Sequence, residues 1–266
     1  MKPKVLVLRA AGTNCDTETA FAFESVGAMA DRVHVNRLKD KEMRLSDYHI
    51  LVIPGGFTYG DDIASGKILA NELRSALFED VKRFIGAGKL ILGICNGFQV
   101  LVKAGLLPDT GRGDFQIEAT LTLNDSARFE DRWIYLRRTK DEGRGTKCVW
   151  TKDVKEIIYL PIAHGEGKFI PKDNKILEQL KKNGQIVFRY ADEKGKASGY
   201  PWNPNGSVDD IAGVCDSTGR ILGMMPHPER YIQPTQHPRW TREGLKGEGH
   251  GLALFRSGVE YARKHL

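Results

Sequence analysis

The sequence has few cysteines and no long apolar run. Its four cysteines are Cys15, Cys95, Cys148 and Cys215, and no two of them form a Cys-x-x-Cys pair. This scatter argues against a disulfide framework and against a cysteine zinc site. No apolar run approaches the roughly 20 residues that a membrane-spanning helix needs, and the first apolar stretch is too short for a signal peptide core. We therefore expect a soluble, cytoplasmic protein that does not contact a membrane.

A strong charge bias is missing as well. Forty Lys and Arg residues against 34 Asp and Glu residues give a net charge of +6, which suits anionic small molecules or an acidic protein partner. No long Lys/Arg block with interleaved aromatic residues occurs, so we expect no nucleic-acid partner. Repeats, low-complexity tracts and a convincing linker are absent too. We expect one domain, residues 1–266, that is large enough to bury a sizeable core.

Short apolar runs alternate with amphipathic segments in the first hundred residues. We expect strands at 4–8, 32–35, 49–53 and 90–94, and helices at 16–26, 65–85 and 96–104. This alternation predicts an α/β fold with a doubly wound, mostly parallel sheet and flanking helices, as in flavodoxin-like proteins. Ligands bind such sheets at the carboxyl ends of the strands.

The pattern changes from residue 116 onward. Residues 117–123 and 133–136 predict strands that pair directly, and residues 211–215 and 220–225 predict a hairpin. Together they indicate a small antiparallel β addition. The charged, glycine-bearing segment 137–147 is expected to be an exposed loop, and residues 249–266 are expected to form a closing amphipathic helix.

The segment Gly93-Ile94-Cys95-Asn96-Gly97 joins the expected strand 90–94 to the expected helix 96–104. Its spacing is that of a nucleophile elbow, with sulfur in place of a serine oxygen. A helix N-terminus favours the reactive thiolate, and the N–H of Asn96 would be free to donate into an oxyanion hole. A buried structural cysteine is the alternative, because free cysteine behaves as a small hydrophobe. The flanking glycines and the strand-to-helix context favour a nucleophile.

A base for this thiol is expected at Pro226-His227-Pro228-Glu229. Prolines hold the segment extended, so His227 and Glu229 share a side, and the carboxylate can fix the imidazole tautomer. The alternative is an exposed turn in which the two residues occur by chance. His164 and Glu166 form a second His-x-Glu pair, and two such pairs could bind a metal. Neither pair lies on a helix with a recognised ligand spacing, so we expect no metal.

The second donor of an oxyanion hole is expected at Pro54-Gly55-Gly56, which follows the strand 49–53. A glycine there can turn its N–H toward a reacting carbonyl without a side chain in the way. A simple turn is the alternative reading of this tripeptide.

These residues resemble the class I, triad-type glutamine amidotransferases. More narrowly, they resemble the glutaminase subunits of phosphoribosylformylglycinamidine synthase, an enzyme of de novo purine biosynthesis. Five further stretches carry the narrower resemblance and span nearly the whole chain in family order: Gly-Thr-Asn-Cys-Asp at 12–16, Pro-Gly-Gly-Phe-Thr-Tyr-Gly-Asp-Asp at 54–62, Pro-Ile-Ala-His-Gly-Glu-Gly at 161–167, Asn-Pro-Asn-Gly-Ser at 203–207 and Gly-Met-Met-Pro-His-Pro-Glu-Arg at 223–230.

The resemblance implies that Cys95 attacks the side-chain amide of L-glutamine, forms a glutamyl thioester and releases ammonia. It implies that His227 is the base and Glu229 its orienter. The remaining residues that it assigns are Gly56 and Asn96 as oxyanion donors, and Gln99, His164, Gly165 and Glu166 as substrate-binding residues.

The resemblance also implies that ammonia passes to a large synthetase subunit, which a small bridging subunit joins to the glutaminase in several lineages. ATP and magnesium are expected on that synthetase, and no cofactor is expected in this chain, which has no phosphate-binding loop. Residues 137–156 and 233–266 depart from the family pattern and are expected to contact partners.

Two other functions compete with this one. A stand-alone cysteine hydrolase or peptidase of a related α/β fold would act without a partner, and a regulatory binding subunit would carry a vestigial elbow. The intact set of Cys95, His227 and Glu229 argues against the regulatory subunit. The motifs outside the triad favour the amidotransferase over the hydrolase.

Overall fold

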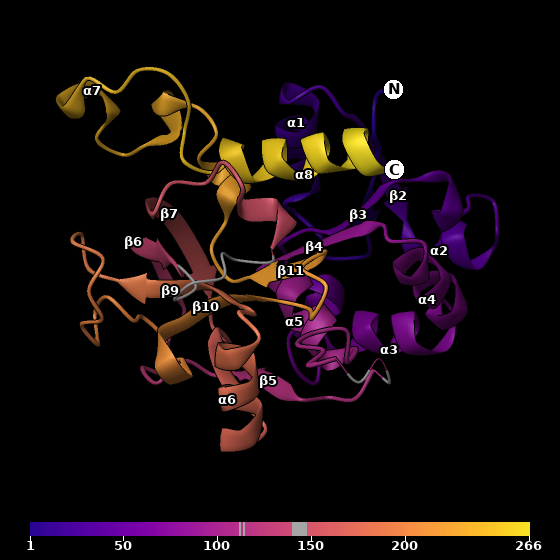
Figure 1. The fold of residues 1–266 in the computed structure, drawn as a ribbon, viewed down its shortest axis with the longest axis horizontal. Coiled ribbons are helices and arrows are strands. Elements are labelled where there is room, and N and C mark those ends of the chain that lie inside the picture. Colours follow the sequence, from indigo (N-terminus) through magenta and orange to yellow (C-terminus); the bar gives the residue numbers. More distant parts are fainter. Residues whose placement is uncertain (112, 114, 140–147) are drawn as a thin grey trace.

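The computed structural model describes residues 1–111, 113, 115–139 and 148–266. A nine-stranded sheet crosses the molecule in the order β2-β1-β3-β4-β11-β10-β9-β6-β7 (Figure 1). Its strands are β1 (Lys4–Arg9), β2 (Met29–His34), β3 (Ile50–Ile53), β4 (Leu90–Ile94), β6 (Glu130–Arg138), β7 (Ile157–His164), β9 (Ile186–Ala191), β10 (Ile211–Cys215) and β11 (Ile221–Met224). The helices are α1 (Asp16–Ser25), α2 (Val35–Lys39), α3 (Lys67–Ser75), α4 (Phe78–Gly86), α5 (Asn96–Lys103), α6 (Asn174–Lys182), α7 (Trp240–Glu243) and α8 (Leu252–His265).

The parallel part of the sheet consists of β2, β1, β3, β4 and β11. Every residue of β3, β4 and β11 is buried, as apolar runs covered on both faces require. Helices α1 and α8 lie on one side of these strands, and α3 and α5 lie on the other (Figure 1). The predicted α/β fold with its doubly wound parallel sheet is confirmed.

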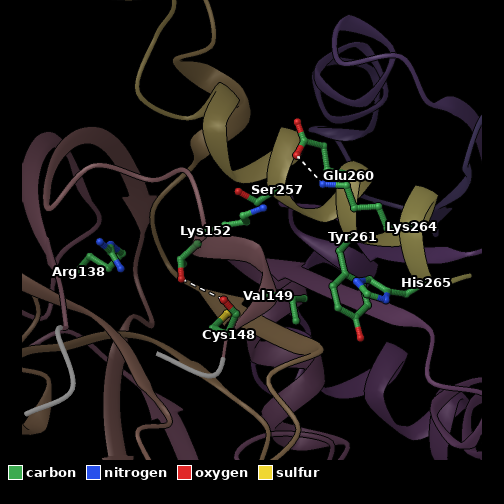
Figure 2. A pocket seen from close by; sticks show the side chains of 10 residues that line it. Arg138, Cys148, Val149, Lys152, Ser257, Glu260, Tyr261, Lys264 and His265 are labelled. Carbon is green, nitrogen blue, oxygen red and sulfur yellow. Dashed lines mark hydrogen bonds and ion pairs between the residues drawn. The ribbon is translucent and has the colours of Figure 1, made fainter. Parts of the chain in front are cut away.

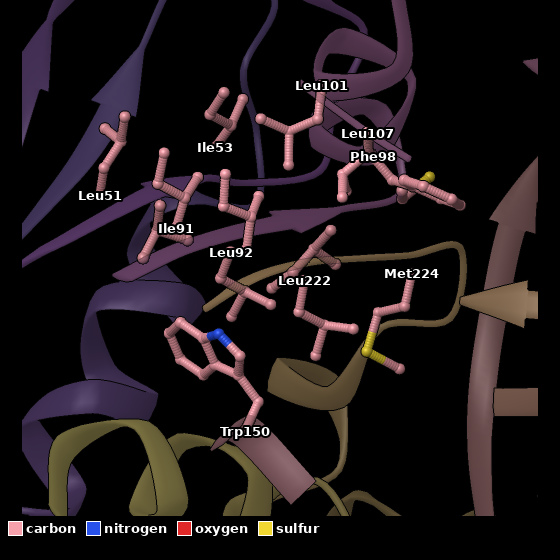
Figure 3. Close-up of a cluster of buried hydrophobic side chains, with 14 of the residues drawn as sticks. Leu51, Ile53, Ile91, Leu92, Phe98, Leu101, Leu107, Trp150, Leu222 and Met224 are labelled. Atoms are coloured by element: carbon pink, nitrogen blue, oxygen red, sulfur yellow. The ribbon is translucent and has the colours of Figure 1, made fainter. Parts of the chain in front are cut away.

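The core lies on both faces of the parallel strands. Figure 3 shows Phe98 and Leu101 of α5 on one side of the sheet and Trp150 on the other. Trp150 is fully buried, and its indole N–H donates to the carbonyl of Arg220 at 3.0 Å. A Cβ on Gly258 of α8 would lie 2.3 Å from the Trp150 ring, so this glycine lets the last helix close over the indole.

Antiparallel strands extend the sheet beyond β11. The predicted hairpin is confirmed, because β10 pairs with β11 in antiparallel register. β9, β6 and β7 follow, and β5 (Ala119–Thr122) and β8 (Lys168–Pro171) form a separate two-stranded antiparallel sheet.

The predicted direct pairing of 117–123 with 133–136 is wrong. β5 pairs with β8, whereas β6 pairs with β7 and β9. Asn124 explains the separation, because its side-chain amide donates to the carbonyls of Arg128 and His164 at 2.8 Å each. These bonds hold the turn between β5 and β6 against the end of β7 and direct the two strands into different sheets.

The helix predicted over 65–85 consists of two helices, α3 and α4. Leu77, with φ −115° and ψ 7°, interrupts the helical backbone and precedes α4. Both helices are amphipathic and bury the same kind of face, so periodicity does not reveal the break. In the segment 137–147, Arg137 and Arg138 belong to β6, and residues 140–147 of the expected loop lie outside the described residues. Across the described chain, no helix combines the length and the apolar character that crossing a membrane requires.

Candidate active site

Four neighbouring parallel strands end at the same edge of the sheet, and a residue that lines one cavity follows each of them. Cys15 follows β1, Gly56 follows β3, Cys95 follows β4 and His227 follows β11. All four line one cavity of about 180 Å³. The other residues of its wall are Asn14, Phe57, Phe129, Ala163 and Arg230. The sheet therefore brings the predicted nucleophile and the predicted base together at the edge where such folds bind ligands.

Cys95 lies on a strained turn between β4 and α5. Its φ of 51° and ψ of −106° are rare for a residue with a side chain and cost free energy that the surrounding packing must supply. Two glycines make that packing tight. A Cβ on Gly97 would lie 1.8 Å from the carbonyl oxygen of Ile53, and one on Gly93 would lie 2.7 Å from that of Gly97. The backbone of α5 thus lies directly against β3 and β4, as the elbow spacing predicts.

The thiol of Cys95 is 5% exposed and donates to the carbonyl of Ala163 at 3.6 Å. His227 Nδ1 lies 2.6 Å from Glu229 Oε1, and both side chains are buried, which confirms the predicted pairing of the two residues. Burial lowers the pKa of His227, but the negative charges of Glu229 and Cys95 outweigh it and raise that pKa well above its ordinary value. The site therefore favours an imidazolium at His227, in the cavity that Cys95 also lines.

The predicted oxyanion donors are backbone amides beside the thiol. Asn96 is the first residue of α5, and N–H groups at that position have no partner inside a helix. Its side chain accepts from Thr58 and donates to Asp61, which fixes the loop after Gly56. Gly56 has φ +146°, and a Cβ there would lie 2.8 Å from the backbone nitrogen of Asn14. Only glycine fits this position in the cavity wall.

Gln99, Gly165 and Glu166 do not line the cavity. Gln99 Nε2 donates to the carbonyl of Glu166 at 2.6 Å, and its Oε1 accepts from Asn96 at 3.0 Å. The Glu166 carboxylate accepts from the backbone of Ser65 at 3.3 Å and pairs with Lys103 at 3.5 Å. These bonds hold the turn after β7 against α5, behind the wall to which Ala163 belongs.

His164 lies behind the same wall. It is 3% exposed, and burial together with the nearby charge of His227 lowers its pKa to about 3. Its Nδ1 donates to Asn124 Oδ1 at 3.1 Å. The imidazole ring packs directly against Gly167, where an added Cβ would lie 2.2 Å from His164 Cε1. His164 is therefore neutral across the physiological pH range and keeps one tautomer.

Comparisons with known proteins agree with this geometry. Residues 2–262 match the family described as the CobB/CobQ-like glutamine amidotransferase domain. The phosphoribosylformylglycinamidine synthase subunit PurQ of Dehalococcoides mccartyi is 48% identical over 264 residues, which cover 99% of each chain. This chain belongs to the PurQ family.

Further members and a solved structure support the assignment. PurQ of Methanococcus maripaludis is 45% identical over 276 residues, covering 98% of each chain. A chain in the structure of PurLQS from Thermotoga maritima superposes with a TM-score of 0.72 at 29% identity, over 98% of this chain and 99% of that one. The predicted resemblance is confirmed: as a PurQ family member, this protein is the glutamine amidotransferase subunit of phosphoribosylformylglycinamidine synthase in purine biosynthesis.

Three features of this PurQ cavity have no role predicted from the sequence: Cys15, Arg230 and the pair of Phe57 and Phe129. Arg230 Nη2 donates to Cys15 Sγ at 3.1 Å, and its guanidinium pairs with Glu18 at 3.6 Å. Phe57 and Phe129 lie with their ring centroids 6.1 Å apart at the cavity, and they are 43% and 51% exposed. Cys15, Phe57 and Arg230 stand in the motifs that carry the family resemblance, and this is the signal that could have found them.

A second, larger cavity of about 390 Å³ lies between α8 and the segment after residue 148 (Figure 2). It contains none of the predicted catalytic residues. Its wall comes entirely from the two stretches expected to contact partners: Arg138, Cys148, Val149, Thr151 and Lys152 from one, and Ser257, Glu260, Tyr261, Lys264 and His265 from the other. The fold thus joins these stretches into one surface.

Proposed function

We propose that Cys95 is the nucleophile of the glutaminase reaction and that His227 and Glu229 complete its triad. The observation that carries the proposal is the convergence of Cys95 and the buried His227–Glu229 pair on one small cavity. A volume of about 180 Å³ suits a free amino acid such as L-glutamine better than a peptide.

In the proposed mechanism, the Cys95 thiolate attacks the side-chain carbonyl carbon of glutamine. The N–H groups of Asn96 and Gly56 donate to the oxyanion that forms. Imidazolium His227 gives its proton to the departing nitrogen, so the C–N bond breaks and ammonia leaves. Neutral His227 then takes a proton from water, which attacks the thioester. The C–S bond breaks, glutamate forms, and the Cys95 thiolate and the His227 imidazolium are regenerated. Glu229 holds Nδ1 and stabilises the imidazolium.

We propose that the predicted substrate-binding residues act from behind the wall of the cavity rather than by lining it. Gln99 fixes the carbonyl of Glu166, and the Glu166 carboxylate fixes Ser65, so both residues hold the turn that ends β7. His164 and Gly165 belong to that turn, and Ala163 before them lines the cavity. In this proposal the four residues position the glutamine through the backbone around Ala163.

The partners proposed for this chain are a large synthetase subunit and a small bridging subunit, in line with the PurLQS structure. ATP and magnesium are expected on the synthetase, no cofactor in this chain, and the complex in the cytoplasm. Ammonia must leave through the cavity mouth, where Phe57 and Phe129 expose apolar rings, and exposed apolar surface marks protein contacts. We therefore place the synthetase over this mouth.

Covalent labelling tests the nucleophile and its substrate together. The full chain, with the synthetase subunit present, is incubated with a diazo-ketone analogue of glutamine, and intact mass is measured with and without excess glutamine. One adduct is expected on the wild type, suppressed by glutamine and absent from Cys95→Ala. Labelling that glutamine does not suppress would instead support the stand-alone cysteine hydrolase, and no labelling would support the regulatory subunit.

Co-elution with the synthetase subunit on size-exclusion chromatography tests the docking surface. Phe129→Ser is expected to weaken the complex by about tenfold, because an apolar anchor is lost from its centre. Phe21→Ser is the matched control, since Phe21 is 48% exposed on α1. Equal binding by both variants would rule out the mouth as the docking surface.

A further inference from the structure

The proposed reaction leaves one buried thiol of the cavity unused. Cys15 is 1% exposed and lies at the end of β1, within the motif Gly-Thr-Asn-Cys-Asp. It lines the same cavity as Cys95 and His227. Its thiol donates to Asn14 Oδ1 at 3.2 Å, and its sulfur accepts from Arg230 at 3.1 Å.

The sulfur of Cys15, a ring nitrogen of His227 and a carboxylate oxygen of Glu229 all lie within 4.8 Å of one another. In the part of the chain that the structure describes, this is the group of three side chains able to hold a metal ion. Thiolate, imidazole and carboxylate are the ordinary ligands of zinc, whose bonds of about 2.0–2.3 Å place ligand atoms roughly 3.3–3.6 Å apart. Shifts of about 1 Å would therefore close the three groups around one ion.

Two further observations favour an ion here. Glu229 Oε2 is buried and has no hydrogen-bond partner among the described residues. Gly55 keeps the space between the ligands open, since a Cβ there would lie 3.1 Å from Cys15 Sγ and 2.7 Å from His227 Cε1. A thiolate and a carboxylate together neutralise a divalent cation, and Arg230, which donates to Cys15 Sγ at 3.1 Å, gives up that contact when the ion binds and keeps its pair with Glu18.

We propose that Cys15, His227 and Glu229 form a binding site for Zn²⁺. Binding releases the thiol proton of Cys15 and requires neutral His227, so the affinity rises with pH. The bound ion coordinates His227 and Glu229, so His227 can no longer act as the base for Cys95, and the glutaminase is held inactive. This inhibitory consequence rests on the proposed function, whereas binding itself does not.

Zinc titration of the full chain against a chromogenic chelator tests the site, with Co²⁺ absorption as a second readout for a thiolate ligand. One ion per wild-type chain is expected. Cys15→Ser keeps a group for Arg230 to donate to and is expected to raise the Kd by about tenfold or more. Cys95→Ser is expected to keep the wild-type affinity, as is Cys148→Ser, a buried cysteine outside this cavity.

Wild-type affinity in Cys15→Ser, or no zinc binding by the wild type, would overturn the proposal. Loss of binding in Cys95→Ser would also overturn it, because the ion would then lie between the catalytic cysteine and histidine. These outcomes are separate from the labelling experiment. A chain that the diazo-ketone does not label can still bind zinc through Cys15.

Discussion

The low pKa of His164 predicts how the stability of the fold depends on pH. The pKa of His164 is about 3 in the folded protein, whereas the ordinary value for histidine is 6.5. Between these two pH values the unfolded chain binds a proton that the folded chain does not. The contribution of His164 to the free energy of unfolding is then fully present above pH 6.5 and decreases as the pH falls. The linkage relation gives a loss of about 2 kcal/mol between pH 7 and pH 5, and a folded pKa of 2 or 4 changes this by only ~0.1 kcal/mol.

His227 acts in the opposite direction. Its pKa is raised by Glu229 and Cys95 despite burial, so its contribution is present below pH 6.5 and decreases as the pH rises. A pH series on the wild type alone would mix the two histidines. Comparison with His164→Asn separates them, because His227 is present in both proteins and the new amide can still donate to Asn124.

Urea unfolding at pH 7 and pH 5 measures the effect. His164→Asn is expected to lose about 2 kcal/mol less than the wild type between the two pH values. His265→Asn serves as the control, since His265 is exposed at the end of α8, and it should follow the wild type. Equal losses in the wild type and His164→Asn would refute the reasoning, because they would mean that His164 binds protons equally in the folded and unfolded states.

Three more predictions follow from the site. Gly97→Ala places a Cβ 1.8 Å from a backbone oxygen and should lower the free energy of unfolding by about 3 kcal/mol. Gly86→Ala has open space around the new Cβ and should raise that free energy by ~0.5 kcal/mol. Equal melting temperatures of the two variants in thermal unfolding would contradict the packing argument. Glu229→Gln should lower kcat on the order of 10³- to 10⁴-fold with little change in KM, and a KM effect alone would contradict the orienting role. Lys103→Met leaves the partly buried Glu166 carboxylate without its cation and should cost about 1–3 kcal/mol in urea unfolding, part of which is restored when Glu166→Gln is added; no recovery would mean that the loss comes from the bonds of Lys103 Nζ to the carbonyls of Ser65 and Leu121.

Local features of the site were predictable from the sequence. The turn at Cys95 depends on residues two positions away, so the glycines that allow α5 to approach β3 and β4 are visible in the sequence itself. His227 and Glu229 are equally local, since an extended segment places residues two apart on one side. In each case neighbouring residues along the chain determine the geometry.

Features that depend on distant partners were not predictable. The pairing of β5 with β8 depends on the turn that Asn124 holds, and Asn124 does so by donating to the carbonyl of His164, a partner that is distant in the sequence. Lys103, Ser65 and Asn96 bond to the polar atoms of Gln99 and Glu166, so the proposed part of these two residues in positioning glutamine depends on contacts that the sequence does not show. Cys15 reaches His227 only because β1, β3, β4 and β11 are neighbours in the sheet.

The strand order also controls when activity can arise during synthesis. β11 lies between β4 and β10, so the strand that delivers His227 joins the sheet long after the strand that delivers Cys95 has left the ribosome. A growing chain that has not reached residue 227 holds the proposed nucleophile without its proposed base. Under the proposed mechanism, glutamine hydrolysis therefore begins only after β11 and residue 227 have been added to the folded sheet.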